Sequence, residues 1–426
     1  MVETSVTEVQ ASPIRVLHLI DGLSWGGSQR WVWDIVRLSD PDRFRHHIVT
    51  VYPDSGDFVY AERLEAAGVY RNVVESSSLR LLRKAILHRL IRYQFISLRK
   101  VLSLAWLIGC HGSMLKRLSE AVYQFKPHVI HVHMFYGLTV GILVKWFINK
   151  PLIHSVPCLF SQMDDAGFAW MPGLYRRFHS KVDCFFTGAS LEDLRAVGVP
   201  ISKTVEIQGV VDLSAIAAVL RERDQHYREA RRSLALNRDA TIVLSVGRLH
   251  PSKGHLYALE AIPGLLKYFQ DLHWVLLGEG DQRPVLELRA KELGIEKHVH
   301  LIGFYSDPLP FYAAADVYLR TTIFEAENLC SYQAMAMGLP VVGFDTGCET
   351  ELLGKVGHGK LVPNKDPITL TKAIEEILLQ PDKGRGLGRL GADYCRDHLD
   401  IQGAISAFCS MYARLARTKE GATIPD

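Results

Sequence analysis

One pattern occurs twice in this 426-residue chain: a buried strand, a loop rich in glycine or basic residues, and a helix with one apolar face. In the first half, Ile14 to Ile20 is an apolar run of strand length, and Gly22, Gly26 and Gly27 precede a helical repeat. In the second half, Thr241 to Val246 is the matching strand. Strands that are apolar on both faces belong to parallel sheets covered on both sides. The repeat therefore predicts an α/β protein with two doubly wound, Rossmann-like parallel-sheet domains.

The domain boundary is predicted where the pattern restarts. Gly209 to Ser214 separate the last strand of the first half from a charged helical stretch at 215–236. Further strands of the second half are expected at Trp274 to Leu277, Val299 to Ile302, Val317 to Leu319 and Val341 to Phe344. We predict a flexible tail at 1–12, an N-terminal domain at 13–210, a C-terminal domain at 211–390, and a C-terminal helix and tail at 391–426 that brace the first domain.

Composition excludes several classes of protein. Lys and Arg number 49 against 46 Asp and Glu, a net charge of +3, which is too small an excess to indicate nucleic acid as a partner. The seven scattered cysteines form no CxxC pair, which argues against a disulfide framework and favours the cytoplasm. We find no signal-peptide pattern and no apolar run long enough to span a membrane.

Charge is nevertheless concentrated in one segment of the first half. Residues 76–119 contain nine Lys or Arg and no Asp or Glu, interleaved with Leu and Ile at helical spacing. Such a basic amphipathic helix is typical of proteins that lie on an anionic membrane surface. The cations expected to meet a membrane or acceptor are Arg83, Lys84, Arg89 and Arg92. The alternative is a solvated basic helix face packed on the sheet.

A basic loop follows the first strand of the second half. Residues 247–254 read Gly-Arg-Leu-His-Pro-Ser-Lys-Gly and precede a helix. They therefore lie at the carboxyl edge of the parallel sheet, where ligands bind in such folds. Arg248 and Lys253 can converge there on a diphosphate.

A second anion-binding element is predicted farther along the chain. Glu325 to Leu329 precede a helix that runs to Ala336 or Met337, and Asn328 is a candidate N-cap. The free N–H groups of this helix start would point at an anion near Arg248 and Lys253.

Together these motifs resemble the retaining glycosyltransferases of family four, which have the GT-B fold, two domains that face each other across a cleft. The resemblance covers about 14–380 and is strongest at 241–363. The family reads G-R-L-x-x-x-K-G, V-x-L-x-G, and E-x7-E followed by A-M-A-x-G-x-P-V-V, and this chain matches from 247 to 342 with Gln333 in place of the second Glu.

The resemblance implies catalytic roles for Glu325, His154, Arg248 and Lys253. The two cations would hold the diphosphate of a nucleotide-sugar donor, UDP- or GDP-linked. Glu325 would bond a sugar hydroxyl, and His154, after the strand Pro151 to Ile153, would face the transferring sugar from the N-terminal domain.

The resemblance also implies a set of donor-binding residues. They are Gly26, Gly27, Gly303, Phe304, Asn328, Leu329 and Gln333. The glycines at 26 and 27 would let the first loop approach phosphate and acceptor. Gly303 and Phe304 would border the base, the backbone at Asn328 and Leu329 would meet sugar and phosphate, and Gln333 would bond the ribose.

No cofactor or metal is expected. Two cations and a helix N-terminus can stabilise a departing diphosphate without a metal ion. His131 and His133 share one strand face, but the sequence places no third ligand near them. Asp40-Pro41-Asp42 has the DxD spacing of metal-dependent enzymes and is interpreted as a turn.

We therefore expect a retaining hexosyltransferase in glycan or polysaccharide assembly, with a glycan or lipid-linked acceptor, in the cytoplasm or on the cytoplasmic face of the membrane. Gln333, and Glu327-Asn328 in place of the family's aromatic-glycine pair, motivate an alternative. In it the chain is a catalytically degenerate GT-B-like scaffold or nucleotide-sugar-binding subunit. A nucleotide-sugar epimerase on the same fold is the third hypothesis.

Overall fold

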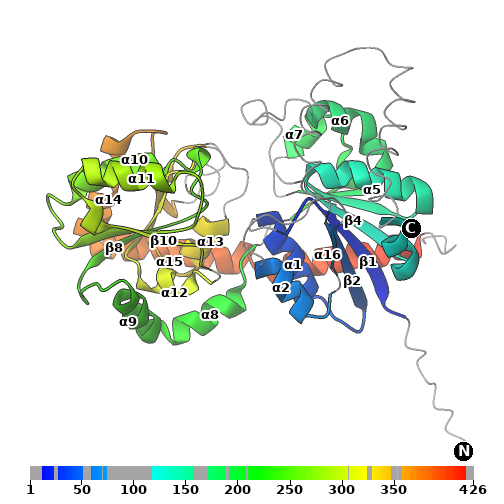
Figure 1. Ribbon diagram of the computed structural model, residues 1–426, viewed down its shortest axis with the longest axis horizontal. Coiled ribbons are helices and arrows are strands. Elements are labelled where there is room, and N and C mark those ends of the chain that lie inside the picture. The colour runs from blue at the N-terminus through cyan, green and yellow to red at the C-terminus, as the bar shows by residue number, and fades with distance from the viewer. Residues whose placement is uncertain are drawn as a thin grey trace, which may run out of the picture. The chain divides into compact units, whose positions relative to one another are not determined.

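The computed structural model describes residues 12–23, 27–50, 59–69, 71–73, 118–156, 171–187, 191–207, 210–305, 307–323, 329–346, 353 and 357–418. The chain forms two compact units (Figure 1). Unit 1 comprises 1–207 and 405–426, and unit 2 comprises 208–404. The chain thus leaves unit 1 after Ile207 rather than at 210, and returns to it at Ile405 rather than at 391.

Unit 1 is built on a seven-stranded sheet in the order β3-β2-β1-β4-β5-β6-β7, and neighbouring strands are parallel. Its strands are β1 Ile14–Ile20, β2 Phe44–Thr50, β3 Arg71–Val73, β4 Val129–His133, β5 Leu152–Val156, β6 Cys184–Thr187 and β7 Thr204–Glu206. The first strand has the predicted bounds. Its residues from Val16 to Ile20 are buried, as expected for a strand covered on both faces.

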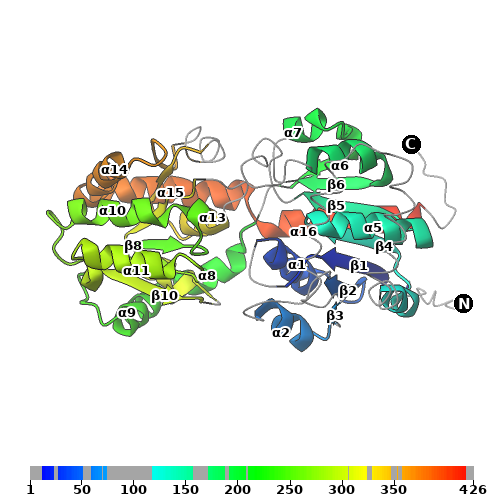
Figure 2. The ribbon, with the colours of Figure 1, turned by 45° about the horizontal axis from the view of Figure 1, so that its top comes forward.

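Helices cover both faces of this sheet. They are α1 Gly27–Leu38, α2 Val59–Ala66, a helical stretch at 118–125, α5 Phe135–Ile148, α6 Met171–Phe178, α7 Leu191–Ala196, and α16 Ile401–Arg417, with 3-10 turns at His179–Lys181 and Ile201–Lys203. One face packs Leu17, Leu19 and Val132 against α5 and 118–125. The other packs Ile20 and Ile48 against α1 and α2, which lie side by side (Figure 2).

Unit 2 repeats the architecture with six parallel strands in the order β10-β9-β8-β11-β12-β13. Its strands are β8 Thr241–Val246, β9 Leu272–Leu277, β10 Val299–Gly303, β11 Val317–Arg320, β12 Val341–Phe344 and β13 Gly359–Val362. Every strand predicted for this half is present. The expectation of two doubly wound parallel sheets is therefore confirmed.

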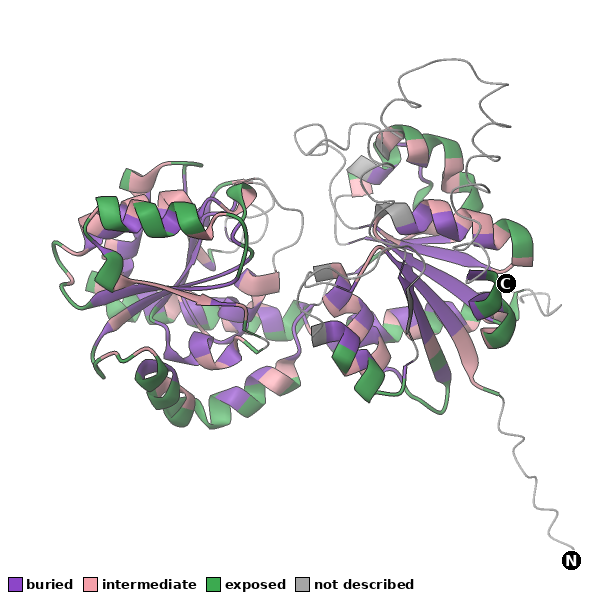
Figure 3. Cartoon of the chain, viewed as in Figure 1, coloured by how far each residue is buried: buried purple, intermediate pink, exposed green. Residues whose placement is uncertain are grey.

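The helices of unit 2 enclose its sheet, with α10 and α11 above it and α8, α9 and α12 below it in Figure 1. The bounds are α8 Leu213–Arg221, α9 Arg223–Ser233, α10 His255–Leu265, α11 Arg283–Glu292, α12 Leu309–Ala314, α13 Leu329–Ala336, α14 Pro367–Leu379 and α15 Pro381–His398, with 3-10 turns at Pro251–Lys253 and Glu296–His298. Burial follows this layering, because the strands of both sheets are mostly buried and the outer helix faces exposed (Figure 3).

Strand order fixes where each sheet can bind a ligand. Unit 1 turns from one direction to the other between β1 and β4, and unit 2 between β8 and β11. Connections from these neighbouring strands run to opposite sides, which opens a crevice at their carboxyl ends. Ligand sites are therefore expected at these two points.

None of the helices that the structure describes is long and apolar enough to cross a membrane. The basic segment predicted to lie on a membrane falls outside the described residues as far as 117, and with it Arg83, Lys84, Arg89 and Arg92.

Candidate donor site and the histidine cluster

Two loops of unit 2 meet at its crevice. Hydrogen bonds join the loop after β8 to the loop after β11: Thr321 Oγ1 donates to the Lys253 carbonyl at 3.1 Å, and Ile323 N–H donates to the Ser252 carbonyl at 2.8 Å. Gly254 makes this approach possible. Its φ is 62°, and a Cβ there would lie 2.1 Å from the Thr321 carbonyl oxygen. The basic loop is thus fixed at the predicted sheet edge.

The loop after β9 supports the basic loop from the other side. Leu249 N–H donates to the Glu279 carbonyl at 2.9 Å. At Gly278, with φ 151°, a Cβ would lie 1.9 Å from the Gly247 carbonyl oxygen. The two backbones therefore run in direct contact, and a side chain at this position would push the basic loop away.

A buried histidine holds the backbone at Arg248. His255 Nε2 lies 3.2 Å from the Arg248 carbonyl, and because a carbonyl only accepts, this nitrogen carries the proton. Burial lowers the pKa of His255 to about 4, so the ring is neutral at pH 7. The loop is therefore anchored by an uncharged group, while the Arg248 side chain stays exposed.

A third cation lies at the same edge and was missed by the sequence analysis. Arg320 is the last residue of β11 and 3% exposed, and its Nη1 lies 3.5 Å from Thr346 Oγ1. The predicted strand ended one residue earlier, at Leu319. An arginine that ends a buried strand at the ligand edge was the signal available in the sequence.

The residues predicted to border the base lie beside the β9 loop. Gly303 ends β10, and its carbonyl accepts from Gly278 N–H at 2.8 Å. Glu279 and Arg283 form an ion pair of 2.5 Å next to it, which lowers the pKa of Glu279. Phe304 follows directly and is half-buried.

The predicted helix is present as α13, which begins at Leu329 and ends at Ala336. Leu329 is half-buried, and Gln333, four residues later, is 6% exposed. Glu325 and Asn328 lie outside the described residues. The structure therefore places the start of this helix after β11 but does not describe its first contacts.

Of the two glycines predicted to bind the donor from the N-terminal domain, the structure describes one. Gly27 is the first residue of α1, and Gly26 lies outside the described residues. The loop after β1 is held in place by Asp21 Oδ1, which accepts from Gly137 N–H at 2.8 Å, and by Gln29 Nε2, which donates to the Gly22 carbonyl at 3.1 Å.

His154 is in a different structural position from the one predicted. The strand does not stop at Ile153, because β5 runs from Leu152 to Val156 and places His154 in its interior, 0% exposed. Its Nε2 lies 2.5 Å from the Tyr175 hydroxyl and its Nδ1 3.3 Å from the Val132 carbonyl. These two partners satisfy the ring inside a sheet that is covered on both faces, which leaves His154 no surface for a sugar.

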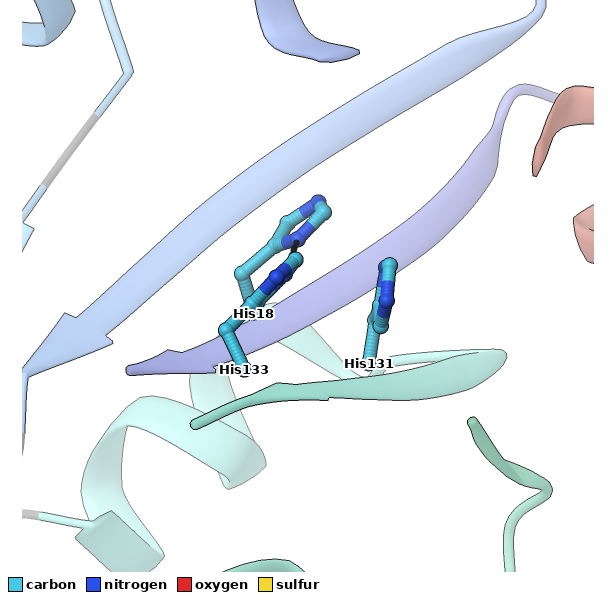
Figure 4. Close-up of side chains that lie close together, drawn as sticks. All are labelled: His18, His131 and His133. Atoms are coloured by element: carbon cyan, nitrogen blue, oxygen red, sulfur yellow. Dashed lines mark hydrogen bonds between the residues drawn. The ribbon is translucent and has the colours of Figure 1, made fainter. Parts of the chain in front are cut away.

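The opposite face of this sheet carries a cluster of histidines: His18 on β1, and His131 and His133 on β4 (Figure 4). From the sequence, no third ligand was expected near His131 and His133. The structure contradicts that expectation, because His18 is the register partner of His131. The turn interpretation of Asp40-Pro41-Asp42 agrees with the structure, where Asp42 N–H donates to Asp40 Oδ1 at 2.9 Å.

Comparison with known proteins assigns the second unit. Residues 226–391 match the family model of glycosyl transferases group 1. This region is a group 1 glycosyltransferase domain. The group 1 domain contains all of the predicted donor-site residues from Arg248 to Gln333, whereas the N-terminal residues lie outside the match.

Curated relatives each match about a third of the chain. A phosphatidyl-myo-inositol mannosyltransferase of Mycobacterium leprae is 34% identical over 142 residues, 32% of this chain and 37% of the relative. A GDP-mannose-dependent alpha-(1-6)-phosphatidylinositol monomannoside mannosyltransferase of Mycolicibacterium smegmatis is 30% identical over 171 residues, 38% of this chain and 44% of the relative. The chain thus spans less than half the length of each.

A solved structure matches over nearly the whole chain. The Anabaena protein HepE, crystallised with UDP and glucose, has a TM-score of 0.73 at 16% identity, covering 94% of this chain and 99% of that one. At this identity the likeness shows the fold alone. The group 1 domain and the N-terminal unit together have the GT-B fold.

Proposed function

We propose that this chain transfers a sugar from a nucleoside-diphosphate sugar to a hydroxyl acceptor, with retention of anomeric configuration, in the assembly of a glycan or polysaccharide. The proposal depends on one observation: Arg248 and Lys253 lie on a loop fixed at the crevice of the group 1 domain, between β8 and β11. Cations at such a crevice are suited to a diphosphate.

The proposed chemistry is a single displacement at the anomeric carbon. The bond from this carbon to the donor phosphate oxygen breaks, and a bond to the acceptor oxygen forms on the same face of the sugar. The acceptor proton passes to the departing phosphate oxygen. Negative charge on the diphosphate grows as the first bond breaks, so Arg248 and Lys253 would stabilise the transition state more than the ground state.

The remaining donor contacts are assigned by the family motif. Glu325 would accept from a sugar hydroxyl, the backbone at Asn328 and Leu329 would meet the sugar and phosphate, and Gln333 would bond the ribose. The pair at 303 and 304 would border the base. His154 has no part in this set because its ring is buried and paired with Tyr175.

The donor is proposed to be a UDP- or GDP-sugar, and the acceptor a lipid-linked or membrane-proximal hydroxyl. The name of one relative specifies GDP-mannose, and HepE was crystallised with UDP. The names of both relatives specify lipid acceptors, and the basic segment at 76–119 would suit an anionic membrane.

Nucleotide binding tests the donor site. A thermal-shift panel of UDP, GDP, ADP, CMP and their sugar conjugates would be run on the wild type and on a variant with Arg248→Gln and Lys253→Gln. A ligand at a hundred times its Kd adds about 2.7 kcal/mol of stability. We expect a shift with one nucleotide that disappears in this variant and persists in a matched control, Lys267→Gln with Lys291→Gln, whose cations are exposed elsewhere on unit 2. A shift that survives in the loop variant would contradict the assignment.

Sedimentation with lipid vesicles tests whether the basic segment at 76–119 binds anionic membranes. We expect binding to vesicles that contain anionic lipid and its loss when Arg83, Lys84, Arg89 and Arg92 are changed to Gln. The matched control neutralises four exposed cations of unit 2, at 221, 228, 267 and 291. Equal loss of vesicle binding in both variants would reject a membrane role for the basic segment. Vesicle binding that does not depend on anionic lipid would reject it too.

Gln333 favours a second candidate, a degenerate subunit that binds a nucleotide sugar without turning it over. Its amide lacks the charge that the family carries at this position in α13. Nucleotide binding without any release of nucleoside diphosphate, in the presence of candidate acceptors, would support this candidate over the transferase.

A further inference from the structure

We propose that His18, His131 and His133 form a binding site for a divalent transition metal of the zinc class inside unit 1. One ring nitrogen from each residue lies within 4.8 Å of the other two, and all three side chains are buried. The site is separate from the donor loops of unit 2, so its test is independent of the proposed transferase activity.

The sheet itself brings the three rings together. β1 and β4 are adjacent and parallel, and His18 is the register partner of His131. His133 lies two residues further along β4, and side chains at i and i+2 of a strand share a face. Figure 4 shows the three rings on the same side of these strands, with His18 and His133 joined by a hydrogen bond.

The spacing of the ring nitrogens suits a shared metal ion. His18 Nδ1 and His133 Nε2 are 3.0 Å apart. Two imidazoles on one tetrahedral zinc, each about 2.05 Å from the metal, have nitrogens about 3.4 Å apart. A ring nitrogen of His131 lies within 4.8 Å of the nitrogens of the other two residues, so it is the third candidate ligand. Metal binding requires the three nitrogens, now within 4.8 Å of one another, to approach to about 3.4 Å.

The rings are also in the protonation state that a metal requires. Burial is the main cause that lowers the pKa of each imidazole: to about 3 for His133, and well below 6.5 for His18 and His131. Only the neutral ring has a lone pair to give to a metal. Metal uptake would therefore not have to discharge an imidazolium, but it would displace the proton of the His18–His133 hydrogen bond.

His18 has a partner for the nitrogen that would not bind the metal, and His131 has partners for both of its nitrogens, one of which the metal would replace. His18 Nε2 lies 2.9 Å from His46 Nδ1. His131 lies between the Tyr412 hydroxyl, 2.6 Å from Nδ1, and Ser155 Oγ, 2.8 Å from Nε2. Hydrogen bonds of this kind fix the orientation of metal-binding histidines and raise their basicity.

The donor set selects the class of metal. Three imidazoles without a carboxylate favour Zn²⁺, Co²⁺, Ni²⁺ or Cu²⁺ over Mg²⁺, Mn²⁺ and Ca²⁺, which prefer oxygen. Because the three side chains are at most 1% exposed, the ion would be enclosed in the core and would stabilise unit 1.

Zinc binding by the full chain tests the proposal. Tag-free protein would be stripped with a chelator and titrated with Zn²⁺, and stoichiometry measured by mass spectrometry of the metal. We expect one equivalent of zinc and a higher Tm, with Mg²⁺ without effect. His18→Asn or His133→Asn should weaken zinc binding on the order of 100-fold or more, because one of three ligands is lost. His154→Asn is the matched control, since His154 is equally buried but on the opposite face.

Cobalt binding can be measured on wild-type protein alone, so this test does not require the variants to fold. Co²⁺ bound in place of zinc by wild-type protein should show the visible absorption of a four-coordinate site, and X-ray absorption should count three imidazole nitrogens. Folded wild-type protein that takes up no zinc would overturn the proposal and leave the cluster as a hydrogen-bonded imidazole network. Zinc bound equally by the wild type and both cluster variants would overturn it too, because the metal would then lie elsewhere.

Discussion

Arg248 and Lys253 depend on neighbours that the basic motif itself does not reveal. His255 anchors the carbonyl of Arg248, and Thr321 on another strand end anchors that of Lys253. The motif predicted the two cations from their spacing and position. It does not include Arg320, whose position at the end of a buried strand could be predicted from the sequence but whose burial results from the packing of neighbouring strands. The spacing of a motif therefore does not predict the residues that support its loop from distant parts of the sequence.

Gly254→Ala tests the loop geometry directly. The new methyl group would stand 2.1 Å from the Thr321 carbonyl oxygen at a φ of 62°, so the two loops must separate. We expect a loss of about 1–3 kcal/mol in the free energy of unfolding, measured by urea denaturation, together with weaker nucleotide binding.

Gly386→Ala is the control for this substitution. Gly386 lies in α15, where an added Cβ meets nothing within 4 Å. Alanine should be neutral there or stabilise by about 0.5–1 kcal/mol, because it favours the helix. Gly254→Ala with wild-type stability would mean that the loops are not in the contact described.

At the level of elements, strands were more predictable than the sites they carry. The bounds of β1, β8 and β12 follow from continuous apolar runs. The bounds of β5 could not be predicted in this way, because His154 and Ser155 interrupt its apolar pattern. A buried histidine is stable there only because it pairs with a residue distant in sequence, Tyr175. His18 could not be assigned to the cluster for the same reason, because a local sequence pattern does not determine which residues of two strands lie opposite each other.

Tyr412 of α16 links the last helix to the sheet of unit 1. Its hydroxyl is hydrogen-bonded to His131 inside the core. Tyr412→Phe would leave His131 Nδ1 buried without that partner, and we expect a loss of about 1–3 kcal/mol in the free energy of unfolding. Hydrogen exchange should locate the loss of protection in α16 and β4.

Tyr394→Phe is the matched control, because the Tyr394 hydroxyl makes no hydrogen bond to the residues that the structure describes, and its stability should change little. Equal protection of α16 in wild type and Tyr412→Phe would show that the hydroxyl does not secure this helix.

On the scale of the whole molecule, the two units share a fold but differ in their content of buried histidine. Among the described residues, six histidines of unit 1 have a lowered pKa, at 18, 46, 47, 131, 133 and 154. Unit 2 has three, at 255, 300 and 358. This difference predicts a different response of the two units to acid.

Unit 1 should lose stability first as pH falls. A histidine with a folded pKa of about 4, such as His46, binds fewer protons folded than unfolded between pH 6.5 and 4. Stability therefore falls with pH across this window, by about 2 kcal/mol for each such group at pH 5. Hydrogen exchange at pH 7, 6 and 5, with chelator present, should show unit 1 opening before unit 2. Simultaneous opening, or unit 2 first, would contradict the assignment of neutral buried rings.

Donor turnover tests whether this chain transfers a sugar. Release of nucleoside diphosphate and formation of a glycosylated product would be measured with the donor that binds, for wild type, for the Arg248→Gln/Lys253→Gln variant and for the Lys267→Gln/Lys291→Gln control. Charged hydrogen bonds contribute roughly 1.5–3 kcal/mol each, so loss of both should slow turnover by about two to four decades. We predict that loss in the loop variant, with the control at the wild-type rate. Unchanged turnover in the loop variant would contradict the role of Arg248 and Lys253, and donor binding without any product in the wild type would contradict sugar transfer.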